Sequence, residues 1–154
     1  MEGYLDFKNK PREYVEARLR EAEVEAALAE EMLRRKLYQD AANKAYMALK
    51  ALISALVVQR LDELARDERK REWYERVGYA APTTGLLRIA RDLEALGLKD
   101  VEYVTRIALS LHRFAYNGFD PNFVDYTDVE EVESDIRRVV GFVKEALRAL
   151  SPPP

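Results

Sequence analysis

The chain has 154 residues, of which 48% are apolar and 34% charged, and its formal net charge is −3. A chain of this length can bury roughly two thirds of its unfolded surface, so it needs no disulfide or metal to hold a core. The sequence has no cysteine, which excludes disulfides, thiolate metal sites and a cysteine nucleophile. Its single histidine, His112, excludes multi-histidine metal sites, and we expect no metal and no cofactor.

Two long helices are predicted in the first half of the chain. Pro11 fits the first turn of a helix whose apolar residues recur at three- and four-residue spacing, namely Val15, Leu19, Ala22, Ala26, Ala29 and Leu33. A short break at Lys36–Tyr38 precedes a second helix from about Gln39 to Ala65. The middle of this helix, Ala41 to Val58, is apolar nearly all round, which is typical of the central helix of a bundle.

Three shorter helices are expected in the second half. The third is capped by Thr83 or Thr84 and ends near Gly97. The fourth runs from Asp100 to about Tyr116, before a strong stop at Asn117-Gly118, and a capping box at Thr127-x-x-Glu130 begins the fifth.

The predicted fold class is all-α, because no segment alternates at period two as a strand would. We expect about five helices in an up-and-down bundle, with the two long N-terminal helices antiparallel. Residues 1–154 form a single domain in this interpretation, with a core of about 12–150 and a disordered proline tail at 151–154.

Segments that would direct the chain to a membrane are not visible in the sequence. The most apolar run, Ala51 to Val58, is too short to span a bilayer, and the first ten residues have no signal-peptide apolar region. We therefore expect no membrane association and a cytoplasmic protein. The 17 arginines against 8 lysines, with few amide side chains, fit a thermophile.

One helical stretch carries the candidate chemistry. Arg106 and His112 lie about 120° apart on an ideal helix, with Ser110, Arg113, Tyr116 and Asn117 beside them as candidate binding residues. A histidine near neutrality can take a proton from a ribose 2′-hydroxyl, and an arginine can stabilise charge on a phosphodiester. The pair is therefore a candidate catalytic pair for metal-free RNA cleavage.

Two observations favour a simpler interpretation of this stretch. An Arg-x5-His spacing is common by chance, so His112 can equally be a polar residue packed beside Tyr116. The segment Asp120 to Asp135 has seven acids and no base, and it would repel a phosphate backbone if it folded near His112.

Three stretches resemble the archaeal PaREP family: Leu19 to Leu56, APTTGLLRIARDL at Ala81 to Leu93, and ALSLHRFAYNGFDP at Ala108 to Pro121. That family is similar to the HEPN superfamily of small helical bundles. The resemblance implies a HEPN-like bundle, a homodimer and an archaeal source. It also implies either a metal-independent ribonuclease with an Arg-x4-6-His motif or an inactive nucleotide-binding or accessory partner. In this chain Ile107 follows the arginine, where HEPN nucleases commonly have a polar residue.

The sequence and the resemblance therefore favour a non-catalytic, dimeric HEPN-like binding or accessory protein that recognises a nucleotide or a protein partner. The alternative is a HEPN-type ribonuclease of a toxin or defence system, with RNA as substrate and Arg106 and His112 as catalytic residues. A second alternative is a purely structural dimer without a ligand.

Overall fold

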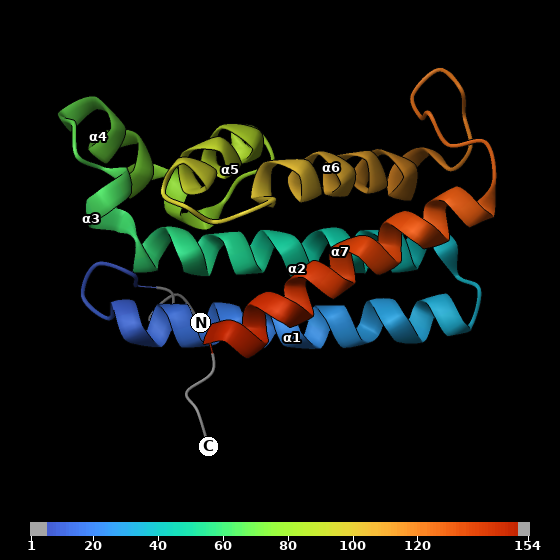
Figure 1. The fold of residues 1–154 in the computed structure, drawn as a ribbon, viewed down its shortest axis with the longest axis horizontal. Helices are drawn as coiled ribbons and strands as arrows, with labels where there is room; N and C mark the ends of the chain where they lie inside the picture. The colour runs from blue at the N-terminus through green and yellow to red at the C-terminus, as the bar shows by residue number, and fades with distance from the viewer. Residues whose placement is uncertain (1–5, 151–154) are drawn as a thin grey trace. The chain divides into compact units, whose positions relative to one another are not determined.

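The computed structural model describes residues 6–150, and within that range every regular element is helical (Figure 1). The expected proline tail at 151–154 lies outside the described residues. The elements are α1 (Pro11–Arg34), α2 (Tyr38–Gln59), α3 (Leu61–Leu64), α4 (Glu68–Arg76), the 3-10 turn η2 (Gly78–Ala80), α5 (Leu86–Ala95), α6 (Val101–Asn117) and α7 (Val129–Leu150).

The all-α prediction is confirmed for the described residues, but the expected count of about five helices is wrong because there are seven α-helices between residues 6 and 150. The difference arises after α2, which ends at Gln59 rather than near Ala65. The charged stretch that follows forms two short helices of its own, and the Asp67 side chain caps the second by accepting a hydrogen bond from the Lys70 amide.

Two other helix starts differ from the expected ones. Neither Thr83 nor Thr84 caps α5; its N-cap is Gly85, whose positive φ of 102° suits glycine. At α7 the capping box is shifted by one residue. The Asp128 carboxylate accepts from the Glu131 amide, and the Glu131 carboxylate accepts from the amide and hydroxyl of Thr127.

The contacts divide the chain into two compact units. The first holds Met1–Glu21 and Lys50–Glu102, and the second holds Ala22–Leu49 and Tyr103–Pro154. Within the first unit Tyr14, near the start of α1, bonds to Ser54, near the end of α2. Within the second unit Glu25 of α1 pairs with Lys44 of α2 at 3.5 Å. Figure 1 shows that α1 and α2 run antiparallel within each unit.

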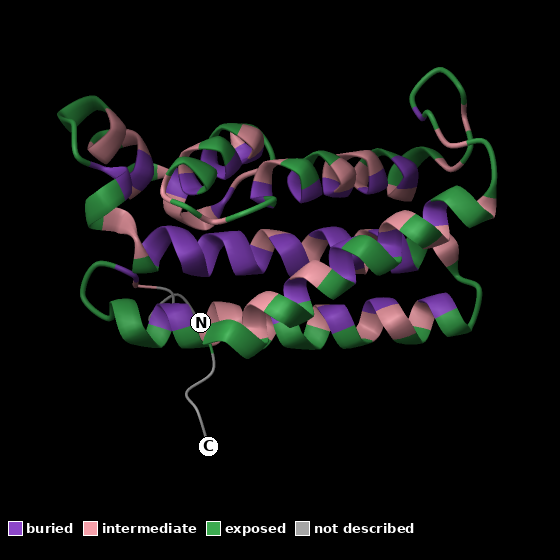
Figure 2. Ribbon diagram, viewed as in Figure 1, coloured by how far each residue is buried: buried purple, intermediate pink, exposed green. Residues whose placement is uncertain are grey.

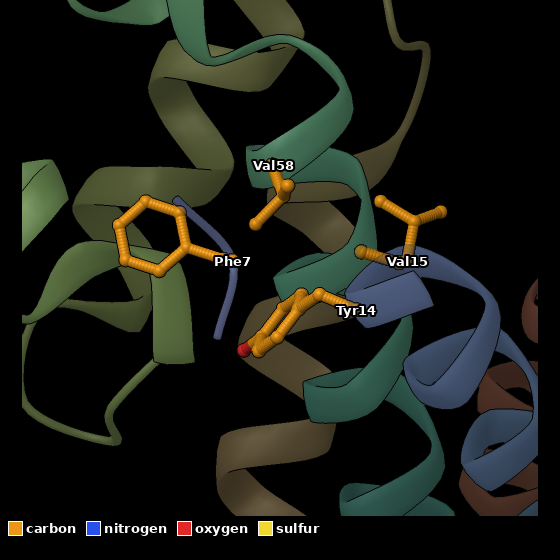
Figure 3. Packing of buried hydrophobic residues seen from close by; sticks show 5 residues of the cluster. Phe7, Tyr14, Val15 and Val58 are labelled. Carbon is orange, nitrogen blue, oxygen red and sulfur yellow. The ribbon is translucent and has the colours of Figure 1, made fainter. Parts of the chain in front are cut away.

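The first unit is built on a small aromatic core (Figure 3). Phe7, Tyr14, Val15, Ala55 and Val58 form this buried cluster. The Tyr14 hydroxyl lies 2.6 Å from the Ser54 hydroxyl, which itself donates to the carbonyl of Tyr79 at 2.6 Å. The polar residues of α2 thus hold the η2 turn, since Lys50 also donates to the carbonyl of Ala80 at 3.2 Å.

The second unit buries small residues of α1 and an apolar stripe of α7. Ala22, Ala26 and Ala29 are buried on α1, and the buried stripe of α7 consists of Val132, Ile136, Val139, Val140 and Val143. The buried residues of α7 recur at three- and four-residue spacing, as in an amphipathic helix.

Helix α2 is largely buried, and Figure 2 draws most of it in the colour of buried residues. The helix has 22 residues, and an 18-residue window of it has a mean hydropathy of 1.3, so by length and composition it could cross a membrane. However, 72% of that window is buried inside the protein, as in the core helix of a soluble protein. The structure is therefore compatible with a soluble protein.

Candidate functional site

All six candidate residues lie on α6, which has one buried and one exposed face. Val104, Ala108, Leu111 and Phe114 fill the core side. Arg106, Arg113, Tyr116 and Asn117 are exposed, and Ser110 and His112 are half-buried between the two faces. The site is thus a helix surface within the second unit.

His112 lies between two tyrosine rings. Its imidazole stacks on Tyr46 of α2, with ring centroids 4.2 Å apart and planes inclined by 27°. Tyr116, one turn later on α6, meets the imidazole edge-on at 5.0 Å and 84°. Edge-to-face and offset stacked rings at these separations attract one another, so the three rings form an ordered aromatic cluster. We call Tyr46, His112 and Tyr116 the ring cluster.

The imidazole of the ring cluster is partly removed from solvent. Its Nδ1 atom is buried and has no hydrogen-bond partner among the described residues. Burial lowers the pKa of His112, and the neighbouring positive charge of Arg113 lowers it further. The imidazole is therefore neutral at neutral pH, the form that can accept a proton or a hydrogen bond.

A second unpartnered polar atom lies on the same stripe of α6. Thr105 is fully buried, and its hydroxyl oxygen has no hydrogen-bond partner in the described part of the chain. Thr105 and His112 therefore each have a buried polar atom without a hydrogen-bond partner in the described residues.

The neighbouring stripe brings three candidate residues together. Arg113 donates through Nη2 to the Ser110 hydroxyl at 3.3 Å, and the Asn117 side-chain amide donates to the Arg113 carbonyl at 2.8 Å. Gln39 of α2 donates to the carbonyl of Ala115 at 3.1 Å. These contacts fix the C-terminal end of α6, and Arg113, three residues before Tyr116, is exposed.

Arg106 and His112 are not brought together along the helix. Six residues of α-helix separate them by about 9 Å along the axis and turn them about 120° apart. Arg106 is exposed on the outer face, whereas His112 faces the Tyr46 ring. Within one chain, the two side chains therefore do not face a common position that one phosphodiester could occupy.

Several acidic residues of the segment Asp120 to Asp135 accept hydrogen bonds from neighbouring residues. Asp128 and Glu131 belong to the cap of α7, and the Asp135 carboxylate accepts a hydrogen bond from the Tyr126 hydroxyl at 2.6 Å. Their charges nevertheless remain in the same unit as the ring cluster. No group of three or more acidic or histidine side chains in residues 6–150 is arranged to hold a metal ion.

Tyr46 is the member of the site that sequence reasoning missed. It is almost fully buried, on the most apolar helix of the chain. From sequence alone, a tyrosine in such a helix is interpreted as a core residue. Its contact with His112 joins two residues that are 66 positions apart in the chain. No local pattern could have revealed it.

The comparisons with known proteins identify the family. The model of the archaeal PaREP1/PaREP8 family matches residues 17–140, which includes most of α1 and all of α6. No curated protein and no solved structure matches the chain.

Proposed function

The chain belongs to the archaeal PaREP1/PaREP8 family, and from this premise we propose that it is a non-catalytic, HEPN-like binding protein that recognises a nucleotide through the ring cluster on α6. The family description names no activity, so the proposal depends on the site. The observation that carries it is the exposure of Tyr116, whose side chain is 74% exposed although its ring meets His112 edge-on.

An exposed, ordered aromatic ring is a platform for a nucleobase. Stacking of a base on an aromatic side chain contributes about 1–3 kcal/mol per base. The contact with His112 limits the rotation of the Tyr116 ring, so less conformational entropy is lost when a base stacks on it. A flexible surface tyrosine would not offer this advantage.

The groups around Tyr116 suit the rest of a nucleotide. The Arg113 guanidinium can pair with a phosphate, and the Asn117 side chain can exchange hydrogen bonds with a base edge or sugar. The acidic run favours a ligand with few phosphates, because every additional phosphate increases its repulsion from Asp120 to Asp135. A mononucleotide or a short oligonucleotide therefore fits better than a long RNA.

The remaining parts of the proposal come from the HEPN resemblance and from composition. They are a HEPN-like arrangement of the helices, a homodimer, a cytoplasmic location and a thermophilic source. A protein partner bound through the same surface is the other outcome that the resemblance allows.

The second candidate function is a metal-independent ribonuclease that uses Arg106 and His112. The lowered pKa of His112 favours it, since a neutral imidazole is the form of a general base. The ribonuclease is disfavoured by the angle of about 120° that separates the two side chains around the axis of α6. The apolar Ile107 directly after the arginine also disfavours it. A purely structural dimer would use neither residue.

A short end-labelled RNA, incubated with the protein in EDTA, tests the proposal against both alternatives. We expect the RNA to be bound and to remain intact, and Tyr116→Ala to weaken binding by about tenfold or more. Cleavage that is lost in both Arg106→Ala and His112→Ala would establish the ribonuclease and overturn the proposal. If the protein binds no mononucleotide and no RNA, the proposal is overturned and the purely structural dimer is the remaining interpretation.

A further inference from the structure

A groove lies between the C-terminal part of α1 and the second half of α7, within the second unit. It encloses about 330 Å³. Its floor is apolar, formed by Leu33, Ile136 and Val140, and it opens at Gly141, where an added side chain would meet nothing within 4 Å. The groove is remote in sequence from the ring cluster and no function described above uses it.

The rim of this groove carries four exposed cationic side chains. Arg34, Arg137, Lys144 and Arg148 line it, against a single acidic lining residue, Glu30. Each cation also pairs with a glutamate one turn away or across the groove. These side chains are about half to two-thirds exposed, and exposed pairs of this kind contribute only about 0–1 kcal/mol each, so an incoming carboxylate can replace a partner at little cost.

The loop between α6 and α7 carries acidic residues and exposed aromatic side chains. Its tip exposes Phe123 at 59% and Phe119 at 42%, which is unusual for phenylalanine. Asp120 and Asp125 flank Phe123, and no Lys or Arg occurs between Asp120 and Asp135. Two turn bonds, from the Asn122 amide to the Asp120 carboxylate and from the Phe123 amide to the Asp120 carbonyl, hold this tip. We call residues 119–125 the acidic loop.

We propose that the groove receives the acidic loop of a second copy of this chain. The exposed phenylalanine would cover the apolar floor at Gly141, and the flanking aspartates would pair with the arginines of the rim. An apolar centre surrounded by charged pairs is the usual composition of a specific interface. The complementarity accounts for two features that are otherwise costly, an exposed aromatic tip and an acidic run without bases.

Reciprocal contact follows from the position of both surfaces on one unit. The acidic loop precedes α7, and the groove opens at Gly141, about 18 Å along that helix from its first residue. If two copies meet across a two-fold axis with their α7 helices antiparallel, each loop reaches the other copy's groove. The same contact is then made twice, which doubles the buried area.

Sedimentation of the wild-type chain and four variants tests the assembly. We expect a dimer, and at least about a tenfold increase in its dissociation constant in Gly141→Leu, which fills the groove, and in Asp125→Arg. Adding Arg137→Glu to Asp125→Arg should restore part of the lost affinity, because the reversed charges attract again. Glu13→Arg, an exposed substitution outside both surfaces, makes the same change in net charge as Asp125→Arg. It serves as the control and should leave the dimer unchanged.

Cross-linking provides an independent measurement, since the chain has no native cysteine. A mixture of Phe123→Cys and Gly141→Cys chains should form a disulfide-linked dimer on mild oxidation, in greater yield than either variant alone. A monomeric wild type, a dimer unaffected by Gly141→Leu and Asp125→Arg, or no preferential cross-link would overturn the proposal. Nucleotide binding is read separately through Tyr116→Ala, so failure of one proposal does not imply failure of the other.

Discussion

The imidazole of His112 stacks on the phenol ring of Tyr46 at a centroid separation of 4.2 Å, while its Nδ1 atom is buried without a hydrogen-bond partner in the described structure. This relationship joins α6 to α2 inside the second unit. Burial at this position lowers the pKa of His112. The imidazole also contacts the exposed Tyr116 ring edge-on.

The lowered pKa of His112 predicts a pH dependence of stability. An unfolded chain takes up the proton near pH 6.5, whereas the folded chain takes it up only at lower pH. The free energy of unfolding therefore falls as the pH drops below about 6.5, and the loss stops once the folded histidine is also protonated.

Urea unfolding of wild type and His112→Gln between pH 7.5 and 5 measures this effect. The difference in stability between the two proteins should shrink as the pH falls, because glutamine does not titrate. The acidic residues titrate in both proteins and cancel in the comparison. A difference that is independent of pH, or an NMR titration midpoint for His112 at or above 6.5, would contradict the assignment.

Gly78 and Gly141 should respond oppositely to alanine. A Cβ at Gly78 would lie 2.6 Å from Tyr74 and 2.7 Å from Trp73, closer than atoms can approach, so Gly78→Ala should cost about 1–3 kcal/mol. Gly141 is inside α7 with open space around it, so Gly141→Ala should stabilise by about 0.5–1 kcal/mol. Thermal unfolding of the two variants measures both changes in stability. Equal changes in the two variants would contradict the close packing of Trp73 and Tyr74 around Gly78.

The Tyr14 hydroxyl is predicted to contribute measurably to the first unit. It is fully buried, bonds to the Ser54 hydroxyl and accepts from Arg18 Nε at 3.1 Å. Tyr14→Phe removes the acceptor of a half-buried guanidinium and should cost about 1–3 kcal/mol. Tyr103→Phe, at a tyrosine that is 55% exposed, is the matched control and should change stability by no more than about 0.5 kcal/mol. Equal losses in the two variants would show that the buried network is not stabilising.

Periodicity predicted the long helices because each contains an apolar stripe that only a helix gathers on one side. The stripe of α7 and the burial of α2 both appear as expected. The end of α2 was misplaced because the charged stretch after Gln59 also suits a helix. Its division into α3 and α4 depends on local backbone geometry at Arg60 and on the Asp67 cap.

The candidate site was predictable in part. The helix and the exposed side chains Arg113, Tyr116 and Asn117 follow from the pattern of α6 alone. The partner of His112 does not, because Tyr46 lies on another helix and its contact is set by how α2 and α6 pack. The burial that lowers the histidine pKa is likewise a property of tertiary packing rather than of sequence spacing.

The most direct test of the proposed function is the affinity for a mononucleotide of wild type, Tyr116→Ala and Tyr103→Ala. Both tyrosines are exposed on α6, but Tyr116 contacts His112, whereas Tyr103 lies near the other end of the helix beside Arg138. Loss of one base-stacking contact should weaken binding by about tenfold or more in Tyr116→Ala and leave Tyr103→Ala unchanged. Equal affinities in all three proteins, or no affinity in wild type, would contradict nucleotide recognition at the ring cluster.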